Sequence, residues 1–342
     1  MANYTPSNKA KAQAMLFDRF KTEALKFRFP ATYLKYLEMT EIMIPSHKVL
    51  RSREDRTVEA YTNARTARAL NGARSHNHTG DKGDSLVLTP SWAIGQDPFS
   101  ISLKQGDNNV FTYPEMLLNE FENSFRNHME GREQEAIDFS FNNRTQVDNT
   151  STTQATWDGT DFVVTIDEAT NGNRAPQIAK TVMEENNLHG SYTFFCDSQA
   201  YDKFAFDSAQ GSGNSTNLSF QYDNITFVRS IGLDTNYGGL AGTYTKGNFI
   251  AVPDGTIGYL DWIPKQNREG KVTTEQTYSN IINPIDNLTY ALHKYSERSD
   301  ESASNGETQD ELEQFEISND GAFVSAILTA ASETVLKAFA LV

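Results

Sequence analysis

Positive and negative charges are separated along this chain. Residues 1–85 contain 15 Lys and Arg but only 9 Asp and Glu, a formal charge of +6. Residues 86–342 contain 15 basic and 36 acidic groups, a formal charge of −21. A basic N-terminal quarter joined to a strongly acidic body attracts something acidic, which can be nucleic acid, an acidic partner or the body of another copy. The question is which of these three it contacts.

The second half of this basic region cannot build a core of its own. Between residues 46 and 85, large apolar side chains are scarce and basic and acidic residues alternate. Such a stretch is either a disordered loop or a long hairpin that leans on something else. Five arginines in it are the candidate contact residues: Arg51, Arg53, Arg56, Arg65 and Arg68.

The clearest helix is predicted at residues 112–139. Thr112 and Glu115 have the spacing of a capping box, and Pro114 stands near the expected start. Such a helix would be roughly 40 Å long at 1.5 Å per residue. Apolar side chains then recur every four residues along it: Leu117, Phe121, Phe125 and Met129.

Shorter elements precede and follow this helix. Apolar spacing predicts an amphipathic N-terminal helix within residues 8–28 and another helix at 175–188, with Gly190 as its C-cap. Asp197 is the expected N-cap of a short helix that ends near Phe204. Period-two alternation and turn residues predict strands at 162–166, 192–196, 218–222, 225–228, 249–252, 257–260, 288–295 and 312–323. The apolar end, residues 323–342, is expected to pack on the body. The fold class is therefore α+β.

Composition limits the possible classes of function. A single cysteine, Cys196, excludes an internal disulfide framework and a thiolate metal cluster. Its neighbours read as a buried strand, so we expect an inert core thiol. Residues 3–27 carry Lys and Arg throughout and do not read as a signal peptide, and no apolar run is long enough to span a bilayer.

The sequence has few motifs with the spacing of a catalytic, cofactor-binding or metal-binding site. His76 and His78 with Asp81 and Asp84 could ligate a metal, but their spacing matches no closed site, and solvated histidines are the favoured interpretation. No glycine-rich phosphate loop and no nucleophile–histidine pair is present. We expect no catalytic, cofactor or metal residue and no enzyme. Only Tyr61 interrupts the basic segment as an aromatic, so a nucleic-acid stacking platform is disfavoured.

The order of these elements resembles the major capsid proteins of tailed bacteriophages, which have the Hong Kong 97-type fold. Two segments carry most of the resemblance: Gly190–Phe195 with Ile225–Ser230, and Leu288–Ser296 with Gln309–Ser318. The resemblance implies an N-terminal arm, an extended loop hairpin, a long spine helix, an axial domain, peripheral-domain strands and a C-terminal segment packing on the axial domain. These parts correspond in turn to residues 1–44, 45–111, 112–141, 142–270, 271–322 and 323–342.

The resemblance also implies a function. It indicates a shell protein, not an enzyme, that self-assembles through hexamers and pentamers into the icosahedral head around double-stranded DNA. Its partners would be further copies of itself, a portal, scaffold or decoration proteins, and packaged DNA bound only non-specifically, with no membrane. It would be assembled in the bacterial host cytoplasm and reside in the virion. Some family members cross-link subunits, but nothing around Lys82 or Lys104 marks either as a cross-linker.

In this interpretation the basic arm and loop of one copy lie across the acidic body of the next, with the five arginines as inter-subunit contacts. Two alternatives remain open. One is an encapsulin-like compartment shell, and the other is a soluble β-rich enzyme or binding protein.

Overall fold

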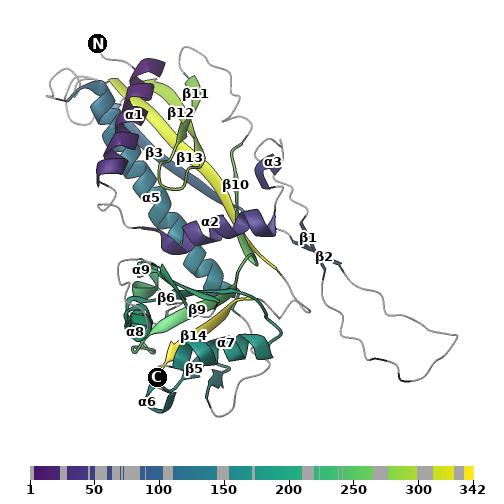
Figure 1. Ribbon diagram of the computed structural model, residues 1–342. Helices are drawn as coiled ribbons and strands as arrows, with labels where there is room; N and C mark the ends of the chain where they lie inside the picture. The colour runs from purple at the N-terminus through teal and green to yellow at the C-terminus, as the bar shows by residue number, and fades with distance from the viewer. Residues whose placement is uncertain are drawn as a thin grey trace.

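A computed structural model gives the arrangement of the chain (Figure 1). It describes residues 4–23, 29–44, 47–50, 60–63, 70, 72, 85–88, 90–102, 111–144, 154–171, 174–209, 219–222, 224–237, 239–240, 242–264, 276–298, 311–326 and 335–342.

One sheet has seven strands in the order β4-β5-β14-β9-β6-β8-β7. The pairs β5–β14 and β6–β8 are parallel, and the other neighbours are antiparallel. Four helices accompany it: α6 (Glu168–Asn171), α7 (Ala175–Glu185), α8 (Ser198–Ala209) and α9 (Ile231–Thr235). Its strands are β4 (Thr156–Asp158), β5 (Val163–Ile166), β6 (Tyr192–Cys196), β7 (Ser219–Tyr222), β8 (Ile225–Arg229), β9 (Asn248–Pro253) and β14 (Lys337–Leu341).

The second sheet has five antiparallel strands built around the long strand β13. On one side β13 pairs with β3, and on the other it pairs with β12 and then β10. The predicted strands at residues 288–295 and 312–323 are confirmed, and they pair with each other as β12 and β13. The strands are β3 (Ala93–Ser102), β10 (Ile257–Trp262), β11 (Gln276–Ile282), β12 (Thr289–Arg298) and β13 (Glu311–Ser325).

The 30-residue helix α5 (Tyr113–Asn142) runs along the five-stranded sheet and reaches the seven-stranded one (Figure 1). Its start is the predicted capping box, because the Glu115 carboxylate accepts a 2.6 Å hydrogen bond from the Thr112 backbone N–H. Helix α1 (Pro6–Glu23) packs against α5, and α2 (Ala31–Met43) crosses it. A short α3 (His47–Leu50) follows.

Stacked aromatic rings fill the core of the seven-stranded sheet. The rings of Phe194, Phe249 and Phe339, from three adjacent strands, follow one another with centroids 5.4 and 5.1 Å apart. All three side chains are fully buried. This packing includes the C-terminal strand β14, so the expectation that the apolar end packs on the body is confirmed.

One local expectation needs correction. Helix α7 ends earlier than predicted, at a Schellman motif in which Asn187, not Gly190, takes the left-handed conformation with φ of 61°. The N–H groups of Asn187 and Leu188 bind the carbonyls of Glu184 and Met183, each at 3.0 Å.

A turn at residues 253–255, with Gly255 at φ of 76°, joins β9 and β10. Strand β9 belongs to the seven-stranded sheet and β10 to the five-stranded one. The turn therefore carries the chain from one sheet to the other.

Candidate assembly surface

The small sheet β1–β2 lies to the side of both large sheets (Figure 1). Strands β1 (Ala60–Asn63) and β2 (Ser85–Leu88) are antiparallel, with Ala60 opposite Leu88. Between them the structure describes Leu70, whose side chain is 100% exposed, and Gly72. An isolated two-stranded sheet is marginally stable in water, so we expect β1–β2 to pack against another surface.

The five predicted contact arginines belong to this region of the chain. Arg51, Arg53, Arg56, Arg65 and Arg68 all lie outside the described residues, so their contacts stay a prediction.

Helix α1 packs on its own chain and places one basic residue of the arm, Arg19, against an acidic group there. Ala12 and Leu16 are its buried anchors. Arg19 Nη1 lies 2.9 Å from Glu122 Oε2, and Arg126 Nη2 lies 2.6 Å from the other oxygen of Glu122. Helix α1 thus packs on its own subunit and pairs Arg19 there. The contact of the basic arm with the next copy stays a prediction.

A second carboxylate, on β13, binds the residues just before α1. Glu313 accepts a 3.3 Å hydrogen bond from the Tyr4 backbone N–H and lies 2.6 Å from Lys294 Nζ. The Tyr113 hydroxyl also donates to it. Lys294 lies 5.3 Å from the centre of the Tyr4 ring, so that ring covers the buried ion pair. Burial raises the pKa of Tyr113, and its hydrogen bond to Glu313 raises it further.

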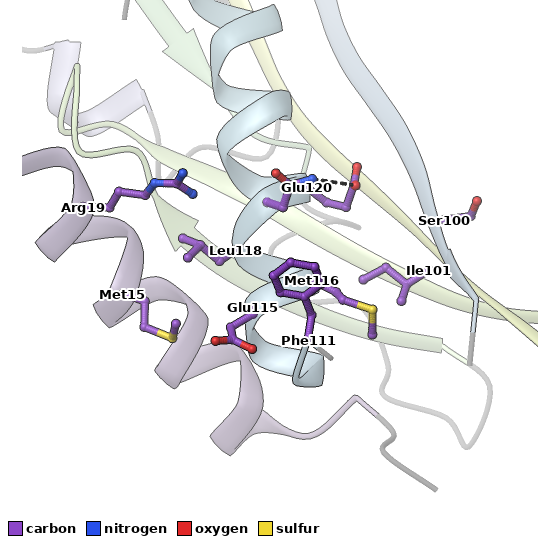
Figure 2. Close-up of a pocket in the computed structure, with 10 residues that line it drawn as sticks. Met15, Arg19, Ser100, Ile101, Phe111, Glu115, Met116, Leu118 and Glu120 are labelled. Atoms are coloured by element: carbon purple, nitrogen blue, oxygen red, sulfur yellow. Dashed lines mark hydrogen bonds between the residues drawn. The ribbon is translucent and has the colours of Figure 1, made fainter. Parts of the chain in front are cut away.

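A hollow of about 640 Å³, lined by both apolar and polar side chains, opens between α1, β3 and the beginning of α5 (Figure 2). Figure 2 shows Met15 coming from α1, Met116 from the first turns of α5, and Phe111 from the chain just before α5. Phe111 is 59% exposed, so apolar surface stands open to solvent here. Methionine side chains adapt their shape to what packs against them. Polar side chains complete the lining: Arg19, Ser100, Glu115, Asn119 and Glu120.

A buried carboxylate on α5 fixes the start of α2. Glu133 accepts hydrogen bonds from the backbone N–H groups of Thr32 at 3.3 Å and Tyr33 at 2.9 Å, and from the Ser230 hydroxyl at 2.9 Å. Because the first N–H groups of a helix have no partner within the helix, a carboxylate there both satisfies them and matches the helix dipole. Ser230 follows β8, so Glu133 joins α5, α2 and the seven-stranded sheet.

Glycines allow α5 to approach the five-stranded sheet. Arg132 is 2% exposed and donates a 2.6 Å hydrogen bond to the Asn319 carbonyl on β13. A Cβ on Gly95 would stand 2.5 Å from Arg132 Nη2. A Cβ on Gly321 would overlap the hydroxyl and ring of Tyr259. Only glycine leaves room for these two side chains.

Groups that could perform chemistry show no site arrangement in the described part of the chain. Cys196 is buried, and burial raises the pKa of its thiol well above the usual range. Among the described residues no three His, Cys, Asp or Glu side chains are grouped to hold a metal ion. His76 and His78 lie outside them. None of the helices within those residues is both long enough and apolar enough to cross a bilayer.

Solved structures supply the decisive comparison. The capsid asymmetric unit of cyanophage Pam1 is similar to this chain with a TM-score of 0.51 and 10% sequence identity, over 85% of this chain and 86% of that one. The chain shares its fold with a phage capsid protein. The mixed helix-and-sheet fold expected from the order of elements is confirmed, and the assignment of its parts to a spine helix and to axial and peripheral domains stays a prediction.

Further capsid structures match with lower scores. The cyanophage A-1(L) capsid asymmetric unit has a TM-score of 0.48 at 9% identity, over 83% of this chain and 87% of that one. The mature capsid of bacteriophage PhiM1 has a TM-score of 0.43 at 11% identity, over 84% and 83%. No protein-family model and no curated protein sequence matches the chain.

Sequence patterns missed the residues that hold this capsid fold together at long range. Glu133 and Arg132 stand on the predicted long helix, but nothing in the sequence pairs them with Tyr33 or Asn319. The ion pair between Glu122 and Arg126 can be predicted from the sequence, because opposite charges four residues apart on a helix lie on the same face.

Proposed function

We propose that this chain is the major capsid protein of a tailed bacteriophage, which self-assembles into an icosahedral shell around double-stranded DNA. The observation that supports it most is the similarity to the Pam1 capsid subunit over 85% of this chain and 86% of that one. The role is structural, and the protein works by assembly rather than catalysis.

In this proposal each element has a place in the capsid subunit. The spine helix is α5, the seven-stranded sheet belongs to the axial domain, and the five-stranded sheet forms the peripheral domain. Strands β1 and β2 belong to the extended loop. The proposed boundaries remain 1–44, 45–111, 112–141, 142–270, 271–322 and 323–342. Strand β3 pairs with β13 although it falls within 45–111, so the extended loop returns to the peripheral sheet before α5 begins.

Neighbouring copies meet, we propose, through the extended loop. Residues 45–91 carry eight basic and five acidic side chains, and the body beyond them is strongly acidic. The receiving surface on the next copy is the hollow beside α5, where Glu115 and Glu120 stand among apolar side chains. Leu70 supplies a fully exposed apolar side chain, and Arg68 and Arg74 flank it in sequence. Such a contact is heterologous, so it closes into rings and, with curvature, into a shell.

The proposed partners follow from this role. Copies of the chain form hexamers and pentamers, and portal, scaffold or decoration proteins complete the head. Packaged DNA is contacted only non-specifically, because the net charge of −15 repels phosphate over most of the surface. The protein is placed in the virion after assembly in the host cytoplasm.

Size-exclusion chromatography with negative-stain microscopy tests the proposal. The purified chain should form rings, sheets or shells, and their yield should fall with added salt because charge attraction is screened. A stable monomer under all salt conditions would overturn it. Particles from the native source should contain a genome, whereas particles that enclose an enzyme would favour the encapsulin-like alternative.

A further inference from the structure

Helix α2 braces the two sheets. At its start, Glu133 and Ser230 tie it to the end of β8. In its middle, the Tyr36 ring lies 5.0 Å from Phe195 of the seven-stranded sheet and 6.1 Å from Phe323 of the five-stranded one. A change in how firmly α2 is held therefore changes how the two sheets are joined.

Hydrogen bonds also hold α2 to the five-stranded sheet. The Thr40 hydroxyl accepts a 2.6 Å hydrogen bond from the Tyr259 backbone N–H on the edge strand β10. The Tyr33 hydroxyl donates to Asp286 Oδ2 at 3.2 Å. Asp286 lies in the turn between β11 and β12.

Asp286 is 7% exposed and accepts three hydrogen bonds. Besides Tyr33, its Oδ2 accepts from the Tyr290 hydroxyl at 2.8 Å, and its Oδ1 accepts from the Leu288 backbone N–H at 2.9 Å. Hydroxyl groups both donate and accept, so a protonated carboxyl can keep its tyrosine partners by reversing one of these bonds.

Titratable groups lie near Asp286 on each element packed around it. Asp261 on β10 is 4% exposed and is a second acidic group, and Tyr259 on the same strand is neutral. On α5, Arg132 forms an ion pair with Glu135 and donates a hydrogen bond to the Asn319 carbonyl. His128 of α5 lies 5.1 Å from the Tyr290 ring. Among the described residues no cation lies within ion-pair distance of Asp286.

We propose that Asp286 makes the brace proton-sensitive: when its carboxyl takes up a proton, α2 is held more firmly to the β11–β12 turn and the two sheets are joined more tightly. The ionised group is buried with an acid rather than a base beside it, and proton uptake removes that burial cost without losing a hydrogen bond. Burial raises the pKa of Asp286 to about 6, and the Asp261 charge also raises it, while its hydrogen bonds act in the opposite direction.

The sign of the effect follows from the two states. An aspartate in the unfolded chain has a pKa of 3.8, so between pH 6 and 3.8 the folded state holds a proton that the unfolded state lacks. The added stability is complete below pH 3.8 and is lost as the pH rises through 6. From pH 7 to pH 5 the ratio of closed to open α2 should rise about tenfold through this group.

Hydrogen exchange of the α2 peptide, corrected for the intrinsic exchange rate, measures this ratio in the full chain. The protection of wild-type α2 should rise about tenfold from pH 7 to pH 5 relative to Asp286→Asn, which cannot titrate. The matched control Asp202→Asn, at an exposed position on α8, should follow the wild type. Parallel pH profiles for wild type and Asp286→Asn would overturn the proposal.

A second variant keeps the test decisive if Asp286→Asn does not fold. Tyr33→Phe removes one hydrogen bond that favours the charged carboxylate, so the midpoint of the α2 response should move to higher pH. An unchanged midpoint would contradict the assignment to Asp286. Neither measurement depends on assembly, so the outcome is separate from that of the capsid proposal.

Discussion

Glu133 of α5 lies 2.9 Å from the backbone nitrogen of Tyr33, a hundred residues earlier in the chain. The same carboxylate also binds the Ser230 hydroxyl. Replacing it with alanine should therefore leave buried donors of α2 without an acceptor. We expect Glu133→Ala to lower the free energy of unfolding by about 2–3 kcal/mol, measured by denaturant titration. The exposed neighbour Glu130 is the matched control, and Glu130→Ala should change stability by less than about 0.5 kcal/mol. Equal effects of the two substitutions would show that Glu133 does not anchor α2.

Two glycines predict opposite effects of the same substitution. A methyl group on Gly321 would overlap Tyr259, so Gly321→Ala should destabilise the protein by about 1–3 kcal/mol. Gly131 lies in the interior of α5 with nothing within 4 Å of an added Cβ. Gly131→Ala should raise the free energy of unfolding by up to about 1 kcal/mol, because alanine favours the helix. Thermal unfolding of both variants tests this pair, and a loss of stability in Gly131→Ala would contradict the open space beside α5.

Local signals in the sequence predict local structure well. Thr112 and Glu115 place the start of the long helix correctly, because a capping box needs only four consecutive residues. Asp197 is confirmed as an N-cap, since its Oδ1 accepts a 2.7 Å hydrogen bond from the Ala200 N–H. The hairpin around Asn224 forms as predicted, with Asn224 at φ of 62°.

The features that sequence patterns cannot predict depend on partners far along the chain. Helix α2 reads only as an apolar run, because it is buried against both sheets and has no polar face with a clear period. Strand β3 pairs with β13 more than 200 residues later, and no turn fixes that register. The hollow beside α5 draws its walls from three separate elements. The location of the candidate surface therefore could not be predicted from the sequence, although the charge separation predicted that an acidic surface would take part in contacts.

Charge reversal in the extended loop tests the loop contact. Arg51→Glu, Arg53→Glu and Arg56→Glu together turn three attractive charges into three repulsive ones against the acidic body. Assembled particles should fall at least about tenfold by negative-stain count, because like charges are brought together at each contact. Circular dichroism should show an unchanged subunit, because the three positions belong to neither of the two large sheets. The same three positions changed to Lys keep the charge and should assemble. Normal assembly of the glutamate variant would sink the loop mechanism while leaving the fold intact.

Cysteine cross-linking tests where the loop lands. Cys196 is buried, so cysteines introduced at exposed positions report alone. Copies that carry only Leu70→Cys should form an interchain disulfide with copies that carry only Asn119→Cys, which lies at the edge of the hollow. The matched control pairs Leu70→Cys with Asp202→Cys on α8, where no cross-link is expected. Particles that assemble without the first cross-link would move the receiving surface elsewhere.

Two buried groups near Tyr290 predict opposing pH effects. Burial lowers the pKa of His128 to about 4. Because the unfolded chain binds that proton near pH 6.5, folding loses stability through His128 as the pH falls from 6.5 to 4. Asp286 gains stability over nearly the same range, from pH 6 to 3.8. The pKa changes of Asp286 and His128 each correspond to about 3 kcal/mol, so the two contributions largely cancel in the wild type.

A double-mutant cycle should reveal this cancellation. Relative to wild type, Asp286→Asn should lose stability on acidification from pH 6.5 to 4.5, because only the His128 contribution remains. His128→Gln keeps a donor for the Ile317 carbonyl, which His128 Nε2 reaches at 3.3 Å, and it should gain stability over the same range. The double variant should return to the wild-type slope, since other titrating groups are common to all four chains. Urea unfolding at closely spaced pH values measures the four slopes. If the unfolding free energy of both single variants changes in the same direction with pH relative to wild type, Asp286 and His128 do not have opposing proton linkages.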